Sequence, residues 1–218
     1  MTAILDLLIL LAALGLAACF RPWLVLSGTD LQHPWLGALV VLPWAWALHA
    51  TLPGGVLIHV SGACLLVLML GWPLAVWTIS LVALAGAALL HLLGQAPAPW
   101  SPAAIEATLT DLVWHGIVPA TLGLLFGLTT RRWLPRHLFV YILARAFIAT
   151  ALAMMGAAAL EALALGHAAQ TTLSDLLVAR WLMAWGEAVA TGMLAAIFVA
   201  FRPSWLLTYS DLRYLPRD

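Results

Sequence analysis

The sequence has very few charged side chains and no lysine. Only 8% of its 218 residues are charged, and all nine basic residues are arginines. A soluble domain of this length needs a much larger charged surface to stay dispersed, so the composition argues against a soluble protein. The formal net charge is zero, which gives no support for nucleic-acid binding.

Cysteine is almost as scarce. Cys19 and Cys64 both lie in apolar stretches, so no disulfide is expected between them and neither indicates a redox compartment. Residues 16–19 resemble a bacterial lipoprotein cleavage site. However, the first basic residue is Arg21, which follows the apolar run instead of preceding it. This charge order predicts a retained N-terminal helix with its N-terminus outside the cytoplasm.

Motifs of known catalytic chemistry are missing from the sequence as well. It contains no ATPase motif, no recognisable nucleophile triad, no zinc-protease motif and no haem-attachment motif. We therefore expect that the chain is not an enzyme, although a membrane enzyme that uses a bound metal stays open as a weaker hypothesis.

Long apolar runs fill the chain, which is 65% hydrophobic with a mean hydropathy of +1.06. A membrane-spanning helix needs about 20 apolar residues. The sequence predicts an all-α, polytopic membrane bundle over residues 1–201 and a short cytoplasmic tail over 202–218. The seven predicted spans are Ile4–Phe20, Trp35–Thr51, Gly55–Leu70, Pro73–Leu93, Thr108–Leu128, His137–Leu165 and Leu176–Phe201.

The second and third of these spans are short and are bounded by Pro/Gly clusters that are typical of turns. They are therefore either two full crossings or a re-entrant pair.

The arginines indicate the orientation of the bundle. Seven crossings with the N-terminus outside and the C-terminus inside put the loop and tail arginines on the cytoplasmic side, as the positive-inside bias expects. These are Arg21, Arg131, Arg132, Arg136, Arg202, Arg213 and Arg217. Arg145, in the inner half of the sixth predicted span, can extend toward the headgroups.

Ionisable groups within the predicted spans gather in the outer half of the bundle. Asp111 and His115 are four residues apart and so share a helix face. Imidazole and carboxylate together form a ligand set for divalent transition metals. His59 and Glu187 lie at a similar depth, so the predicted metal ligands are His59, His115, Asp111 and Glu187. Such binding weakens as pH falls, because the ligands become protonated.

A structural interpretation of the same groups stays open. Histidines at the outer ends of helices can simply sit in the membrane interface. Arg180 and Glu187 are seven residues apart on one helix face and can form an internal ion pair that orders the bundle.

Several segments carry a family resemblance. The stretch Pro53-Gly54-Gly55-Val56-Leu57-Ile58-His59-Val60-Ser61-Gly62 is followed by Leu70-Gly71-Trp72-Pro73. An L-P-x-x-x-F-V-Y-I segment spans 134–142, an E-x-x-x-x-G-M segment spans 187–193, and R-P-x-W-x-x-T-x-x-D-x-R-Y-L spans 202–215. Together these resemble the CbiM-like cobalt/nickel-transport permease family, and most closely a divergent branch known as energy-coupling factor ABC transporter permeases.

The resemblance implies a substrate-specificity subunit of about seven spans in the bacterial cytoplasmic membrane, working with a membrane coupling subunit and cytoplasmic ATPase subunits. In these permeases the N-terminal amine, a histidine at position two and a histidine in the third span capture the metal near the outer face. His59 matches the third-span histidine, but the chain begins Met1-Thr2-Ala3. The resemblance therefore implies Ni or Co as the transported ion, with Zn or Cu still open. The alternative is a non-transporting membrane subunit or assembly factor whose polar cluster is structural.

Overall fold

The computed structural model describes residues 2–27, 30–48, 50–51, 57–58, 60–165 and 173–214. These residues form a helical bundle with one pair of two-residue antiparallel strands, β1 (Ala50–Thr51) and β2 (Leu57–Ile58). The helices are α1 (Thr2–Cys19), α2 (Trp23–Leu26), α3 (Gln32–Ala47), α4 (Ala63–Leu70), α5 (Trp72–Leu92), α6 (Pro102–Asp111), η1 (Leu112–Ile117), α7 (Val118–Trp133), η2 (Val140–Ile148), α8 (Ala149–Leu165), α9 (Leu173–Phe201), η3 (Pro203–Trp205) and α10 (Asp211–Tyr214).

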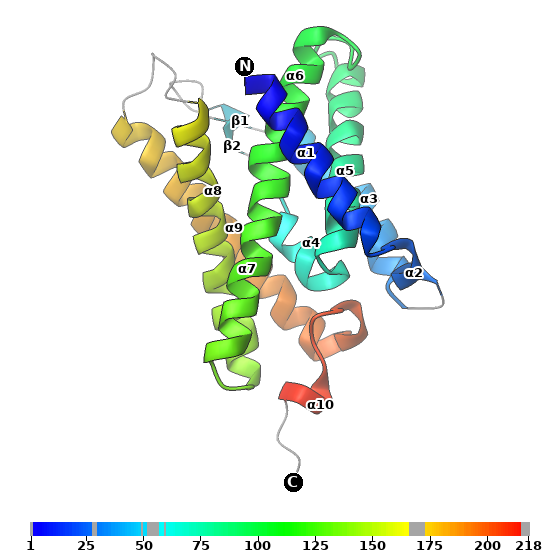
Figure 1. The fold of residues 1–218 in the computed structure, drawn as a ribbon, viewed down its shortest axis with the longest axis vertical. Helices are drawn as coiled ribbons and strands as arrows, with labels where there is room; N and C mark the ends of the chain where they lie inside the picture. The colour runs from blue at the N-terminus through cyan, green and yellow to red at the C-terminus, as the bar shows by residue number, and fades with distance from the viewer. Residues whose placement is uncertain are drawn as a thin grey trace.

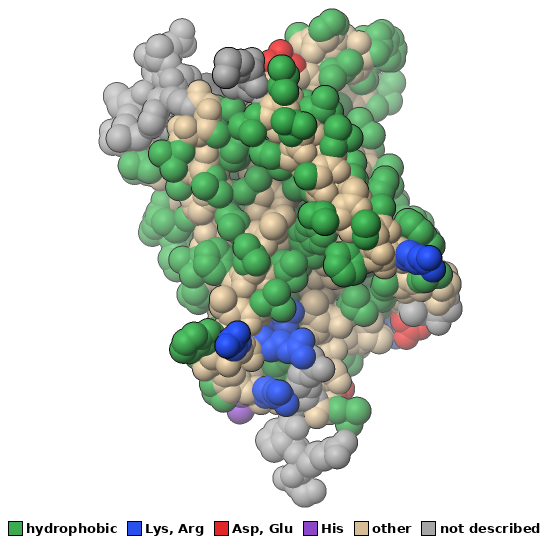
Figure 2. Space-filling view, viewed as in Figure 1, with side chains coloured by type: hydrophobic (Ala, Val, Ile, Leu, Met, Phe, Trp, Pro, Cys, Tyr) green, Lys and Arg blue, Asp and Glu red, His purple; other side chains and the backbone are tan. Residues whose placement is uncertain are grey.

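The predicted all-α membrane fold is confirmed at this level. Within the described residues, four helical segments are long and apolar enough to cross a membrane: Trp72–Leu92, Pro102–Trp133, Val140–Leu165 and Leu177–Phe201. The segment Pro102–Trp133 joins α6, η1 and α7 into one central helix (Figure 1). Large apolar side chains cover most of the face seen in Figure 2, and many of them are exposed, as lipid-facing side chains are.

The predicted third span is wrong as a continuous helix over Gly55–Leu70. The helix α4 begins only at Ala63, because Gly62 adopts a left-handed backbone with a φ of 70° that interrupts any helix entering from before it. With 8 residues, α4 is about 12 Å long, far short of the 30 Å apolar core of a bilayer. The helix α4 packs against α5, α7 and α9, and seven of its residues are buried. A broken helix at membrane depth is tolerated where protein surrounds it in this way.

The residues after α9 cap the other end of α4. The last carbonyl groups of a helix have no partner within the helix. The carbonyl of Met69 accepts a hydrogen bond from the amide of Leu207 at 3.0 Å, and that of Leu68 accepts one from the hydroxyl of Thr208 at 2.8 Å. The segment 206–214 is therefore docked on the bundle, and Leu206, Tyr209 and Tyr214 are buried.

We expect a Gly62→Ala variant to lower the free energy of unfolding by about 1–3 kcal/mol, because alanine is strained in the left-handed region. A Cβ at this position would also lie 2.7 Å from Cδ2 of Leu42. Gly186→Ala is the matched control, since a Cβ there meets nothing within 4 Å. Thermal unfolding in detergent measures both variants, and an unchanged Gly62→Ala midpoint would contradict the expected strain.

Candidate functional site

His115 is held at both ring nitrogens. Its Nδ1 lies 3.2 Å from Oδ1 of Asp111, and its Nε2 contacts the guanidinium of Arg180. A guanidinium can only donate, so Nε2 accepts and the ring proton lies on Nδ1, facing the carboxylate. His115 is 6% exposed. The two contacts therefore fix the ring between Asp111 and Arg180.

The local backbone explains why His115 is also joined to the rest of the site through its carbonyl. It lies in η1, a π-helical segment inside the central helix. Pro119, four residues further on, has no N–H to donate back to the carbonyl of His115. That carbonyl accepts instead from the hydroxyl of Ser61.

Arg180 pairs with a different acid from the one the sequence suggested. Its Nη2 lies 2.6 Å from Oε2 of Glu161 on α8, and both side chains are mostly buried. The suggested internal pair of Arg180 with Glu187 is therefore wrong. The spacing of seven residues puts both on one face of α9, but it also separates them by about 10 Å along the helix. Arg180 contacts Glu161 on α8, whereas Glu187 contacts the amides that precede α4.

Glu187 closes the N-terminus of α4. Its Oε2 accepts from the amide of Ser61 at 3.0 Å, and its Oε1 accepts from the amide of Gly62 at 2.6 Å. These two amides belong to the residues directly before α4, and the N-terminal end of a helix favours a negative charge. The side chain is 3% exposed, so this carboxylate acts as a buried cap for the broken helix.

Ser61 joins the two halves of the site. Its amide reaches Glu187, its hydroxyl reaches the carbonyl of His115, and its carbonyl accepts from the indole of Trp46 at 3.0 Å. We refer to the connected set as the polar network. It contains Trp46, Ser61, Gly62, Asp111, His115, Glu161, Arg180 and Glu187.

Three of the four predicted metal ligands thus belong to one network, and His59 lies outside the described residues. Within the described part of the chain, no group of three His, Cys, Asp or Glu side chains is placed to hold a metal ion. Asp111 and His115 are adjacent, whereas Glu187 is turned to the amides of α4. As it stands the arrangement orders the bundle, and His115 can ligate a cation only if Arg180 moves.

An apolar cavity of about 250 Å³ lies next to the network, between α3, α5 and α6. Its wall includes Trp46, Ala83, Gly86, Leu90 and Ala104, and Asp111 is the charged residue that it exposes. The carboxylate of Asp111 is 37% exposed. A ligand in the cavity would therefore meet the network at Trp46 and at the charged Asp111.

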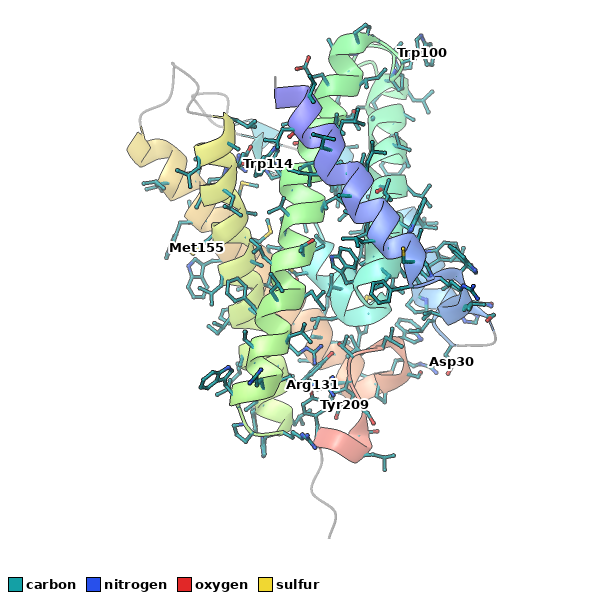
Figure 3. All side chains as sticks on the ribbon, in the orientation of Figure 1. Asp30, Trp100, Trp114, Arg131, Met155 and Tyr209 are labelled. Carbon is teal, nitrogen blue, oxygen red and sulfur yellow. The ribbon has the colours of Figure 1, made fainter. Side chains whose placement is uncertain are left out.

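Sequence reasoning missed a second buried carboxylate. Asp6 on α1 is fully buried, and it accepts hydrogen bonds from Thr110 at 2.8 Å and from the indole of Trp114 at 2.9 Å. Trp114 lies where α1 crosses the central helix (Figure 3). The sequence signal for it is an acid inside an apolar run.

No family model, curated protein or solved structure matches this chain. The fold and the site are therefore interpreted from the residues of the chain itself.

Proposed function

We propose that this chain is the membrane-embedded substrate-specificity subunit of a divalent transition-metal uptake system in a bacterial cytoplasmic membrane. The observation that carries the proposal is the contact between the buried His115 and the partly exposed Asp111, an imidazole and a carboxylate side by side within a helical bundle. The resemblance to the CbiM-like permeases supports the same function and implies Ni or Co as cargo. A membrane coupling subunit and cytoplasmic ATPase subunits supply the energy.

The proposed topology is seven crossings with the N-terminus outside and the C-terminus inside, the third crossing being completed by α4. Two observations support it. The described chain begins and ends at opposite ends of the molecule, as an odd number of crossings requires (Figure 1). The arginine side chains on the face shown in Figure 2 gather in the half that carries the C-terminus, in keeping with the positive-inside bias.

In this proposal Arg180 occupies the metal-binding nitrogen of His115 until an ion displaces it. The ion enters beside Asp111, displaces the guanidinium from Nε2 of His115 and binds that nitrogen. Asp111 contacts Nδ1 on the opposite side of the ring, so the imidazole has to turn before Asp111 can ligate the same ion. Arg180 keeps Glu161 as its partner at 2.6 Å when it leaves His115. His59 and Glu187 are the further ligands that we propose, and Glu187 has to leave the α4 amides to reach the ion.

Isothermal titration of the purified chain with Ni, Co, Zn and Cu tests the function. We expect binding tighter than about 1 mM for at least one ion, and a loss of about tenfold or more in His115→Ala and Asp111→Asn. His91→Ala is the control, because its ring contacts Trp100 and the carbonyl of Ala96 outside the network. Absence of binding, or equal binding by all variants, would overturn the proposal.

A second candidate is a non-transporting membrane subunit or assembly factor. It is favoured by the internal use of both ring nitrogens of His115 and both oxygens of Glu187. Elemental analysis of protein purified from metal-supplemented cells separates the two functions: a bound transition metal favours transport, whereas a metal-free chain in a stable complex of other subunits favours assembly.

A further inference from the structure

Arg145 is a buried cation without an anionic partner in the described part of the chain. It lies in η2, is 9% exposed, and its Nε has no hydrogen-bond partner. The ion pairs of the described residues involve His115 and Arg180 instead. The side chain therefore does not extend to the headgroups as the sequence suggested. Burying an unpaired charge is strongly unfavourable, so a compensating group is expected.

The direct contacts of the Arg145 guanidinium are with two tyrosines. Its guanidinium carbon lies 5.6 Å from the ring centre of Tyr141, and its Nη1 donates to the hydroxyl of Tyr214 at 3.4 Å, a long hydrogen bond. Gly127 on α7 lets the side chain pack closely, because a Cβ there would lie 3.4 Å from Nε. These contacts fix the position of the guanidinium but leave its charge uncompensated.

A small cavity opens beside this guanidinium. Arg131, Arg136 and Arg145 line it with Thr130, Tyr141 and Tyr214. Its volume is about 10 Å³, room for one oxygen-sized group at its base. Arg131 and Arg136 are exposed at its mouth, so three positive charges surround one opening. A water molecule could hydrogen bond there, but only an anion would compensate the charge.

The aromatic wall of the cavity is preorganised. Tyr209 stacks on Tyr214 at 5.4 Å between ring centres and meets Tyr141 edge-on at 5.0 Å. Burial, helped by the Asp211 carboxylate, raises the pKa of Tyr209 to about 12, so this phenol carries no negative charge at neutral pH. Tyr209 therefore does not supply the negative charge that Arg145 lacks.

We propose that this cavity binds a phosphate group. One phosphate oxygen enters the base beside Arg145, and Arg131 and Arg136 contact the oxygens that remain outside. Guanidinium groups suit phosphate because their N–H groups match its oxygens in pairs. The phosphate comes either from an anionic phospholipid headgroup or from free phosphate in solution. Basic pockets between spans on the cytoplasmic side are typical lipid-headgroup sites.

The test uses the full chain in neutral detergent with two probes. Inorganic phosphate is titrated by calorimetry, and retention of phosphatidylglycerol is measured by native mass spectrometry. We expect Arg145→Met to weaken binding of the effective probe by about tenfold or more. Arg132→Met is the matched control. Arg132 is exposed in the last turn of α7, next to Arg131, but it does not line the cavity. Retention of the lipid alone assigns the site to a headgroup, and binding of phosphate alone assigns it to a soluble ion.

A second readout separates binding from folding. Arg145→Met removes an unpaired buried charge, so without either probe it should unfold at the same or a higher temperature than the wild type. With the probe, only the wild type and Arg132→Met should gain thermal stability. Equal binding by Arg145→Met, or no binding of either probe, would overturn the proposal. Phosphate binding seen only after removal of residues 215–218 would also overturn it, because the C-terminal residues of the chain would then be the natural occupant of the cavity.

Discussion

Replacement of Glu187 by alanine is expected to lower the free energy of unfolding by about 2–6 kcal/mol. The substitution leaves the amides of Ser61 and Gly62 buried without acceptors, at about 1–3 kcal/mol each. No water is expected to replace the carboxylate easily, because Ser61 is fully buried and Glu187 nearly so. The helix α4 should therefore lose its N-terminal anchor and open locally before the long helices unfold.

Two variants make this expectation specific. Glu187→Gln keeps one carbonyl acceptor and should lose less than Glu187→Ala. Glu106→Ala removes an exposed carboxylate from α6 and should change the stability by less than about 0.5 kcal/mol. Thermal unfolding gives the order of the three, and hydrogen exchange should show faster exchange in α4 for the Glu187 variants. Identical exchange in α4 for the wild type and Glu187→Ala would show that the carboxylate does not hold this helix.

The long helices could be predicted from the sequence because an apolar run of span length has to satisfy its backbone hydrogen bonds within itself. The run predicted as Pro73–Leu93 is found as Trp72–Leu92 for this reason. The break at Gly62 could not be predicted in the same way. The apolar composition continues through it, and its stabilising partner, Glu187, is 125 residues further along the chain.

The contacts of the candidate site also divide into local ones, which the sequence predicts, and long-range ones, which it does not. The contact between Asp111 and His115 follows from their spacing of four residues, which is local. The pairing of Arg180 with Glu161 does not follow from the sequence, because the position of Glu161 depends on how α8 packs against α9. For the contact between the Ser61 hydroxyl and the His115 carbonyl, the usable sequence signal is Pro119. A proline frees the carbonyl four residues before it, here that of His115, and a buried carbonyl needs another donor.

Joint replacement of Arg180 by methionine and Glu161 by glutamine is expected to raise metal affinity by about 10- to 100-fold. A hydrogen bond to a charged group contributes about 1.5–3 kcal/mol, and an incoming ion has to break the one between Arg180 and Nε2 of His115. The double change removes both members of the buried pair, so no single unpaired charge is left behind. It also removes a positive charge that repels a divalent cation.

The same variant separates the two candidate functions. If His115 is a ligand held in reserve, calorimetry with Ni or Co should show the gain in affinity, and adding His115→Ala should abolish it. The single variant Arg180→Met, which leaves Glu161 buried and unpaired, is the control for lost stability. If the polar network only orders the bundle, the double variant should be less stable than the wild type and bind metal no better. That outcome would favour an assembly role, because His115 would then be free to bind and still show no affinity.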